Sequence, residues 1–137
     1  MRSTALAAAA LAIALMGTAC GANRDTADTP PASRRPASTA KLQVLEPAPG
    51  AVLSGSTTLV KLQLQGAKLV PQTTKRIKPD EGHIHLSLDG LVVSMTSGLE
   101  QEIPITKGTH LLQAEFVAGD HFPFNPKVVT NTTFTVQ

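Results

Sequence analysis

Apolar and polar residues alternate over 83–88, Asp89-Gly90 follows, and a second apolar-rich segment covers 91–95; this pattern constrains the fold more than any other feature of the chain. Asp-Gly is the strongest short signal for a β-hairpin, because a type I′ turn needs a positive φ angle at both central residues. Side chains alternate between the two faces of a strand, so every second residue of 83–88 shares a face. The pattern predicts two antiparallel strands, at 83–88 and 91–95, joined by a two-residue turn.

Short segments of this kind, separated by turn residues, recur from residue 41 onward, and helical periodicity is missing there. About seven short strands in just under 100 residues are typical of an immunoglobulin-like antiparallel β-sandwich, in which two sheets bury their apolar faces against each other. We therefore predict an all-β fold of this class. The other expected strands cover residues 41–45, 57–65, 99–105, 109–117 and 128–136, with a long loop over 66–82.

The first twenty residues have the character of a targeting segment. Arg2 precedes an apolar run of 12 residues, 5–16, which fits a signal-peptide core and is shorter than the roughly 20 residues of a membrane span. The run leads to Gly17-Thr18-Ala19-Cys20, which contains the only cysteine of the chain. Small residues before a lone cysteine resemble the lipobox of bacterial lipoproteins, and this resemblance implies that Cys20 is lipidated. Plain secretion with a free thiol is the alternative.

Residues 21–40 are rich in Pro, Ala, Ser, Thr and charged residues. They contain too little apolar surface to offset the entropy of ordering, so we expect a disordered tether with Arg34-Arg35 in solvent. The expected organisation is a signal peptide (1–19), a lipidated cysteine with its tether (20–40) and a sandwich domain (41–137). It places the domain in the cell envelope, anchored to the membrane through lipid on the extracytoplasmic side.

The charge of the domain argues against a nucleic-acid partner. From residue 41 onward, eight basic residues balance eight acidic ones. The sequence pI of about 8.9 therefore comes from the signal and the tether. The chain also has no Trp and no Tyr. A neutral surface without these stacking side chains lacks the groups that nucleic-acid binding uses.

The hairpin geometry assigns the histidines of GHIHLSLDG (82–90) to one face of their strand. A regular two-residue turn pairs Ser87 with Val92 on the histidine face. It places the other aliphatic residues of both strands on the opposite face, so that this face, Met95 included, belongs to the core. His83 and His85 then stand about 6.5 Å apart on the solvent-facing side. The predicted core-facing pairs are Leu88 with Leu91, Leu86 with Val93, and Ile84 with Met95.

A second strand brings further ligand types toward these histidines. If strand 109–117 lies antiparallel beside strand 83–88, Glu115 comes near His85, and the loop that follows carries another histidine toward His83. Imidazole and carboxylate groups at one end of a sheet suit Zn(II) or Cu(II). Solvent-facing or hydrogen-bonded histidines without a metal are the alternative. The candidate metal ligands are His83, His85, His121 and Glu115.

His110 is expected to have a structural role. It begins strand 109–117 and shares parity with Leu112, Ala114 and Phe116, so it should face inward at the edge of the strand. In immunoglobulin-like sandwiches this place often holds a tyrosine whose hydroxyl ties down the preceding corner. A ring N–H of His110 can form the same kind of hydrogen bond.

Three segments together resemble an uncharacterised family of bacterial envelope domains. That family has a Gly-His-x-His-Leu start, a Pro-Gly-x-His-x-Leu-Gln strand and an Asp-x-x-His-x-Pro-x-x-Pro-x-Val segment. Lys107 replaces the usual proline, and Asp120 lies directly beside the histidine of the third segment. The resemblance implies a sandwich in the cell envelope and no particular activity. The matching positions are Gly82, His83, His85, Leu86, Gly108, His110, Leu112, Gln113, His121, Pro123, Pro126 and Val128.

The sequence favours a binding module over an enzyme. It contains no Gly-x-Ser-x-Gly elbow and no phosphate-binding glycine loop. A cupin-like metalloenzyme is the enzyme alternative, since His83, His85, Asp89 and His110 imitate the cupin ligand spacing. We predict a lipid-anchored module of the envelope that binds Zn or Cu through surface histidines. A purely structural domain, or one that binds another envelope protein without a metal, is the further alternative.

Overall fold

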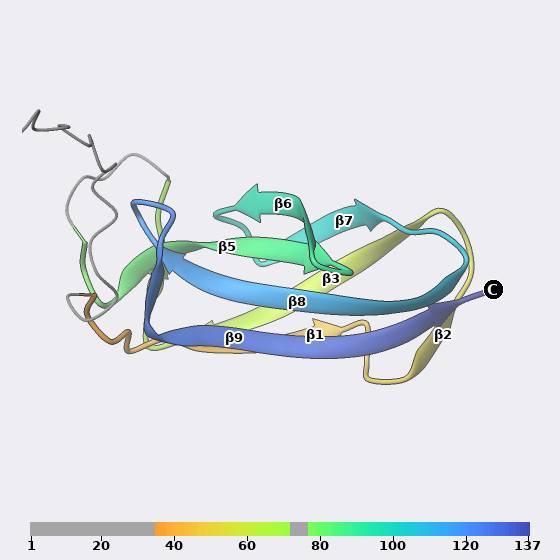
Figure 1. Ribbon diagram of the computed structural model, residues 1–137, viewed down its shortest axis with the longest axis horizontal. Helices are drawn as coiled ribbons and strands as arrows, with labels where there is room; N and C mark the ends of the chain where they lie inside the picture. The colour runs from red at the N-terminus through yellow and green to blue at the C-terminus, as the bar shows by residue number, and fades with distance from the viewer. Residues whose placement is uncertain (1–34, 72–76) are drawn as a thin grey trace, which may run out of the picture.

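The computed structural model describes residues 35–71 and 77–137, which form two packed β-sheets (Figure 1). The described residues contain no helix, and hence none that could cross a membrane. The smaller sheet has the order β1-β3-β7, and the larger has the order β2-β9-β8-β5-β4, with β6 paired to β5. The strands are β1 (Lys41–Glu46), β2 (Ala51–Leu53), β3 (Thr57–Gln65), β4 (Lys68–Leu69), β5 (Glu81–Leu88), β6 (Leu91–Thr96), β7 (Glu100–Pro104), β8 (Gly108–Ala118) and β9 (Pro123–Val136).

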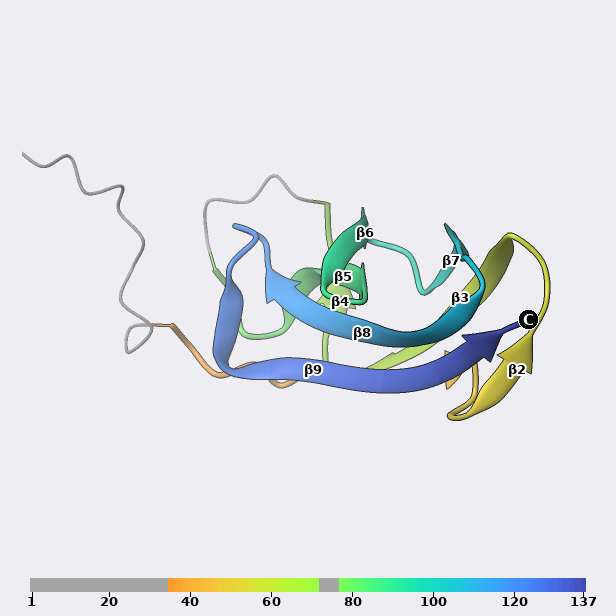
Figure 2. The ribbon, with the colours of Figure 1, turned by 45° about the vertical axis from the view of Figure 1, so that its right-hand side comes forward.

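The predicted all-β, immunoglobulin-like sandwich is confirmed. Each of the seven expected strands is present, and the structure adds the short strands β2 and β4. These two strands make the only departures from antiparallel pairing among the described residues, since β2 lies parallel to β9 and β4 parallel to β5. The long strands β8 and β9 run side by side along the whole larger sheet (Figure 2).

The core lies between the two sheets and is built by alternation along the strands. In β8 every second residue from His110 to Phe116 is buried. Phe116 stacks on Phe124 with ring centroids 5.6 Å apart, and Phe134 is also almost fully buried. Burying a large apolar side chain stabilises the fold by about 1.5–3 kcal/mol, so these phenylalanines compensate for the missing disulfides. The remaining core residues are Val60, Leu62, Ile84, Leu86, Ile103, Ile105, Leu112, Ala114, Ala118 and Val136.

A β-bulge in the β5–β6 hairpin makes the predicted register wrong beyond the first two pairs. Ser87 pairs with Val92 as expected, but Leu86 pairs with Ser94, because Val93 is an extra residue in β6. One inserted residue reverses the facing of every residue that follows it. Met95 therefore lies opposite His85 and not in the core.

The exposure of β6 corrects the prediction that its aliphatic residues fill the core. Leu91 is 74% exposed and Met95 is 51% exposed. The physical reason is that β6 pairs only with β5 at the edge of the sheet, and that the bulge turns polar Ser94 toward β7. There its hydroxyl donates a hydrogen bond to the side chain of Gln101.

The described residues before the expected domain boundary at residue 41, from Arg35 onward, already contact the sandwich. The Asn125 amide donates to the Pro36 carbonyl, and the Ser38 hydroxyl donates to the Pro79 carbonyl. Arg35 is buried, so the expectation that it lies in solvent is wrong. The apolar run, Cys20 and Arg34 lie outside the described residues.

Candidate metal centre

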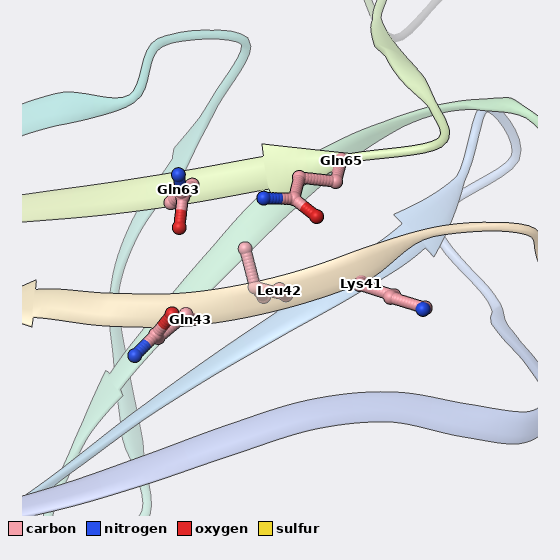
Figure 3. Close-up of a pocket in the computed structure, with 5 residues that line it drawn as sticks. All are labelled: Lys41, Leu42, Gln43, Gln63 and Gln65. Carbon is pink, nitrogen blue, oxygen red and sulfur yellow. The ribbon is translucent and has the colours of Figure 1, made fainter.

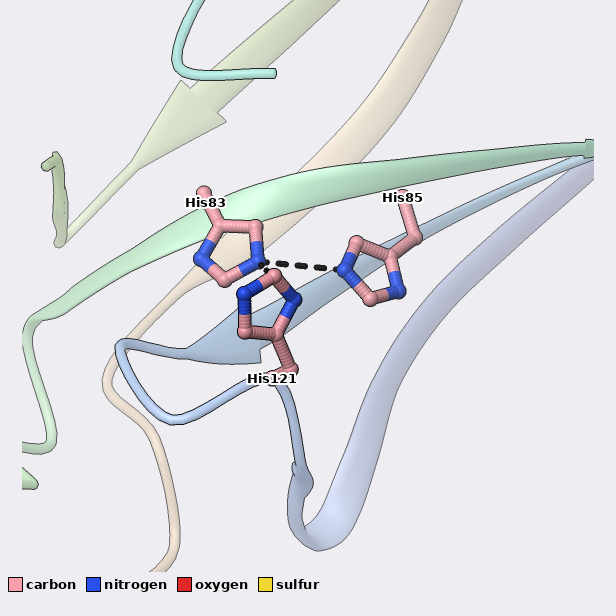
Figure 4. Close-up of side chains that lie close together, drawn as sticks. All are labelled: His83, His85 and His121. Atoms are coloured by element: carbon pink, nitrogen blue, oxygen red, sulfur yellow. Dashed lines mark hydrogen bonds between the residues drawn. The ribbon is translucent and has the colours of Figure 1, made fainter. Parts of the chain in front are cut away.

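Three histidines from two separate segments meet at one end of the larger sheet (Figure 4). His83 and His85 lie on the same face of β5, opposite the core residues Ile84 and Leu86. The adjacent strand β8 runs antiparallel to β5, with Val117 beside His83, and the loop after β8 carries His121 back over β5. The predicted parity of β5 is therefore confirmed, and its neighbour is the expected one.

The ring nitrogens are spaced closely enough to share one metal ion. His83 Nε2 lies 3.0 Å from His85 Nε2 and 3.3 Å from His121 Nδ1. One potential ligand atom from each of the three residues lies within 4.8 Å of the others. A tetrahedral ion with bonds of about 2.1 Å holds its ligand nitrogens about 3.4 Å apart, so small side-chain movements would complete the geometry.

The shared nitrogen of His83 cannot form two full hydrogen bonds without a further group. A neutral imidazole nitrogen offers either one proton or one lone pair, yet His83 Nε2 faces a nitrogen of each of the other two rings. The rings also lie close together, with His83 and His121 in an edge-on arrangement at a centroid distance of 4.6 Å. A cation that accepts three lone pairs would satisfy all three nitrogens at once.

Burial differs sharply among the three ligands. His83 is fully buried, His85 is half-buried and His121 is exposed. The expectation that both β5 histidines face solvent is therefore wrong for His83, because the β8–β9 loop covers it. The cluster is open to solvent on the His121 side and closed on the His83 side.

Burial favours the unprotonated form of the two β5 histidines. Burial, followed by repulsion from His85 and His121, lowers the pKa of His83 to about 4, although Asp120 opposes the shift. Burial is also the main cause of the lowered pKa of His85. Neutral imidazole is the form that binds metal ions. His83 Nδ1, which is buried, has no hydrogen-bond partner among the described residues.

Glu115 lies beside the cluster but is not part of the three-residue group. It pairs with His85 across β5 and β8, as expected, and its charge raises the pKa of His85 against the larger lowering effects. Its Oε1 atom lies 3.8 Å from Lys127 Nζ, which places a competing cation at the carboxylate. The geometry therefore brings together three of the four predicted ligands.

The cupin-like arrangement is not formed. His110 and Asp89 are bound to each other, with His110 Nδ1 2.7 Å from Asp89 Oδ2, and neither belongs to the histidine cluster. His110 Nε2 donates to the Thr106 carbonyl at 2.7 Å, which is the kind of corner bond that the sequence suggested. The sequence places Asp89 in a turn and in the cupin-like spacing, but its contact with His110 carries no local sequence signal.

The proton on each His110 nitrogen follows from its partners. A carbonyl and a carboxylate can only accept hydrogen bonds, so both ring nitrogens donate and the ring carries a positive charge. Accordingly, the hydrogen bond to Asp89 is the main cause of the raised pKa of His110. The Leu111 amide, followed by His110, lowers the pKa of Asp89.

A separate hollow lies on the smaller sheet (Figure 3). Three glutamine side chains from β1 and β3 line it together with Lys41 and Leu42, and none of these residues is a usual metal ligand. It lies on the sheet opposite the one that carries the histidines. The lining residues are Lys41, Leu42, Gln43, Gln63 and Gln65.

Comparison with solved structures supports the fold and nothing finer. The chain is similar to the fibronectin(III)-like modules of Clostridium thermocellum CbhA, with a TM-score of 0.53 and 12% identity over 73% of this chain. The match covers 47% of that chain, so this protein spans about half the length of its structural neighbour. An engineered protein matches with a TM-score of 0.44 and 13% identity, over 72% of this chain and 20% of that one. No family model and no curated protein matches the sequence.

The fold and the cluster together describe a β-sandwich domain with a candidate metal site. The chain carries an immunoglobulin-like β-sandwich that is similar to fibronectin(III)-like modules. One end of its larger sheet presents three histidines with the spacing of metal ligands.

Proposed function

We propose that the domain is a binding module for a transition metal ion, held by His83, His85 and His121. The observation that carries this proposal is the approach of two nitrogens to His83 Nε2. One belongs to His85, at 3.0 Å, and the other to His121, at 3.3 Å, which comes from a distant part of the sequence. The three imidazoles suit Zn(II) or Cu(II), whereas Ca(II) and Mg(II) prefer oxygen ligands.

Three protein ligands leave a fourth coordination position for water or for a ligand from a partner molecule. The exposed side of His121 is where this position would face solvent. Such a site can hold a metal ion and exchange it. The two carboxylates nearest the cluster, Asp120 and Glu115, interact with Arg35 and Lys127, which favours metal binding over catalysis.

We also propose that the module acts in the cell envelope, anchored by lipid on Cys20. The lipobox-like residues before Cys20 support this placement. Cys20 and Arg35 are fifteen positions apart in the chain, with fourteen residues between them. A fully extended chain of that length spans at most about 50 Å, so the metal centre would stay near the membrane surface.

Replacing Cys20 with serine should release the protein from the membrane fraction. If the serine variant stays in that fraction, the anchor is wrong.

Metal binding is tested on the mature chain carrying Cys20→Ser, which removes the lipid and the only thiol. We expect one Zn(II) per chain by isothermal titration calorimetry. Each of His83→Ala, His85→Ala and His121→Ala should weaken binding by on the order of 100-fold or more, because each removes one of three ligands. Glu115→Gln is the matched control and should leave the stoichiometry unchanged. Zn(II) binding as tight as that of the wild type in the three histidine variants would contradict the proposal.

The surface of β6 favours a second candidate function, docking of another envelope protein. β6 is an edge strand on which Leu91, Val92 and Met95 are all more than half exposed. Exposed apolar edge strands are natural sites of strand pairing. Val92→Lys should then abolish crosslinks between this chain and an envelope partner in intact cells, while Zn(II) binding stays unchanged. Crosslinks that survive the substitution would exclude β6 as the docking surface.

A further inference from the structure

Arg35 is almost fully buried at the point where the chain enters the domain, and its guanidinium is bound to the loop between β8 and β9. Its side chain is 5% exposed. Nη1 and Nη2 donate to the two carboxylate oxygens of Asp120 at 2.6 and 2.9 Å, a bidentate pair. Nη2 also donates to the Phe122 carbonyl at 2.8 Å, and Nε donates to the Pro123 carbonyl at 3.0 Å.

These contacts hold the loop on both sides of His121, its candidate metal ligand. Asp120 and Phe122 are the two sequence neighbours of His121, and Arg35 binds both of them. The guanidinium also lies 5.7 Å from the centroid of the Phe122 ring. One side chain from the N-terminal segment therefore fixes the residues before and after His121.

The loop needs such support because its backbone is unusual at the ligand. His121 has a φ angle of +69°, in the left-handed region that residues with a Cβ rarely adopt. Its amide donates to the Ala118 carbonyl at 3.0 Å, and the Ala118 amide donates to the Phe122 carbonyl at 3.1 Å. In this tight turn His121 Nδ1 points back at His83 Nε2. A relaxed loop would carry the His121 ring away from the other two.

Arg35 also controls which atoms face the cluster. Its guanidinium donates to both carboxylate oxygens of Asp120, so neither oxygen is free to join the cluster. The cluster is consequently left with nitrogen ligands only, although a carboxylate sits one residue from His121.

We propose that Arg35 is a positioning residue for the metal ligand His121, so that docking of the N-terminal segment and metal affinity are coupled. This inference rests on the proposed function. Coupling between two sites is reciprocal in free energy, so a bound metal ion also strengthens the docking of Arg35. The segment that leads from the proposed lipid anchor into the domain thereby becomes part of the metal centre.

The test compares Zn(II) affinities, measured by competition with a chromophoric chelator, at a temperature where thermal melts show every variant to be folded. Groups that orient metal ligands typically contribute 10–100-fold in affinity, so we expect a loss of at least about 10-fold for Arg35→Gln. Arg35→Lys should lose as much, because an ammonium cannot bind both carboxylate oxygens and two carbonyls in one plane. Lys61→Gln is the matched control: it breaks an exposed ion pair with Glu46 on the smaller sheet and should leave the affinity unchanged.

A double-mutant cycle separates positioning from general stabilisation. If Arg35 acts through His121, Arg35→Gln should cause no further loss of affinity in the His121→Ala background. The Co(II) absorption spectra of the Arg35→Gln and His121→Ala variants should also change in the same way. If Arg35→Gln does not fold, Asp120→Asn breaks the same contact from the other side and should give the same pattern.

Two results would overturn the inference while the proposed metal site stands. One is wild-type affinity in Arg35→Gln or Asp120→Asn. The other is a loss that is equally large with and without His121, because that would show an effect on the whole domain. Failure of the unmutated protein to bind Zn(II) at all would instead refute the metal site, and the inference with it.

Discussion

The carboxylate of Asp89 lies 2.7 Å from Nδ1 of His110, so a turn residue of the β5–β6 hairpin is bound to the corner between β7 and β8. The ring is charged, because its other nitrogen donates to the Thr106 carbonyl. This pair joins two connections of the sandwich at the end opposite the histidine cluster, and it makes the stability of the fold depend on pH.

We expect Asp89→Asn to destabilise the protein most between about pH 4 and pH 6.5. The pKa of His110 is raised by Asp89, so its contribution is complete below the unfolded pKa of about 6.5 and is lost as the pH rises through the folded value. The pKa of Asp89 is lowered, so its contribution is present above the unfolded pKa of about 3.9 and is lost as the pH falls through the folded value.

The measurement is urea unfolding of the wild type and of Asp89→Asn across this pH range. Asparagine tolerates the positive φ of 53° at this position, so the variant removes charge without straining the turn. The difference in unfolding free energy should shrink on both sides of the window. If the difference in unfolding free energy between the two proteins stays constant from pH 5 to pH 9, the His110 ring is not charged in the folded state.

Gly82 is expected to be required where β5 begins, one residue before the buried metal-ligand candidate. A Cβ atom at Gly82 would lie 2.1 Å from the Val117 carbonyl oxygen and 2.8 Å from a ring carbon of Phe116. The backbone oxygen cannot move without parting β5 from β8, so Gly82→Ala should cost about 1–3 kcal/mol of unfolding free energy or more.

Gly98→Ala is the control for this substitution, since its Cβ would meet nothing closer than the Thr96 hydroxyl at 3.4 Å. It should change the urea midpoint far less than Gly82→Ala. Similar effects of the two substitutions would mean that β5 and β8 are not as close at Gly82 as described.

The bulge at Val93 predicts that Met95 contributes little to stability. Because Met95 is half exposed and opposite His85, Met95→Ala should cost no more than about 0.5 kcal/mol. Leu86→Ala, at a fully buried position of the partner strand β5, should cost about 2–5 kcal/mol. Both values come from chemical denaturation. A loss of more than about 2 kcal/mol of unfolding free energy for Met95→Ala would instead support the regular hairpin register, in which this side chain lies in the core.

His83 is expected to reduce the stability of the metal-free protein. It is fully buried, and its Nδ1 atom has no hydrogen-bond partner among the described residues. Leaving such a group unsatisfied costs about 1–3 kcal/mol, so His83→Leu should raise the melting temperature without metal. The rise that wild type gains from Zn(II) should vanish in this variant. A lower melting temperature for metal-free His83→Leu would show that the buried ring is well satisfied.

The sequence was sufficient for the parts of the structure that depend on local alternation. The parity of β5 places Ile84 and Leu86 in the core and the histidines on the other face, and the antiparallel pairing with β8 sets Glu115 opposite His85. These features follow from the two-residue period of a strand and from the order of strands in a sandwich. The fold class follows from the same signals.

The remaining features depend on contacts that no local pattern encodes. The residues from Leu91 to Val93 are all aliphatic, so a one-residue slip leaves the pattern almost unchanged and the bulge cannot be seen in it. The burial of His83 depends on a loop that is held by Arg35, a residue that composition assigns to a solvated tether. Long-range pairs of this kind are visible only once the chain is folded.

X-ray absorption at the zinc edge tests the central claim most directly, using the Cys20→Ser protein loaded with one equivalent of Zn(II). We predict three imidazole nitrogens at about 2.0–2.1 Å with the outer-shell scattering of histidine rings, plus one light-atom ligand in the fourth position. His121→Ala should reduce the imidazole count to two. A spectrum of oxygen ligands without imidazole scattering would contradict the account.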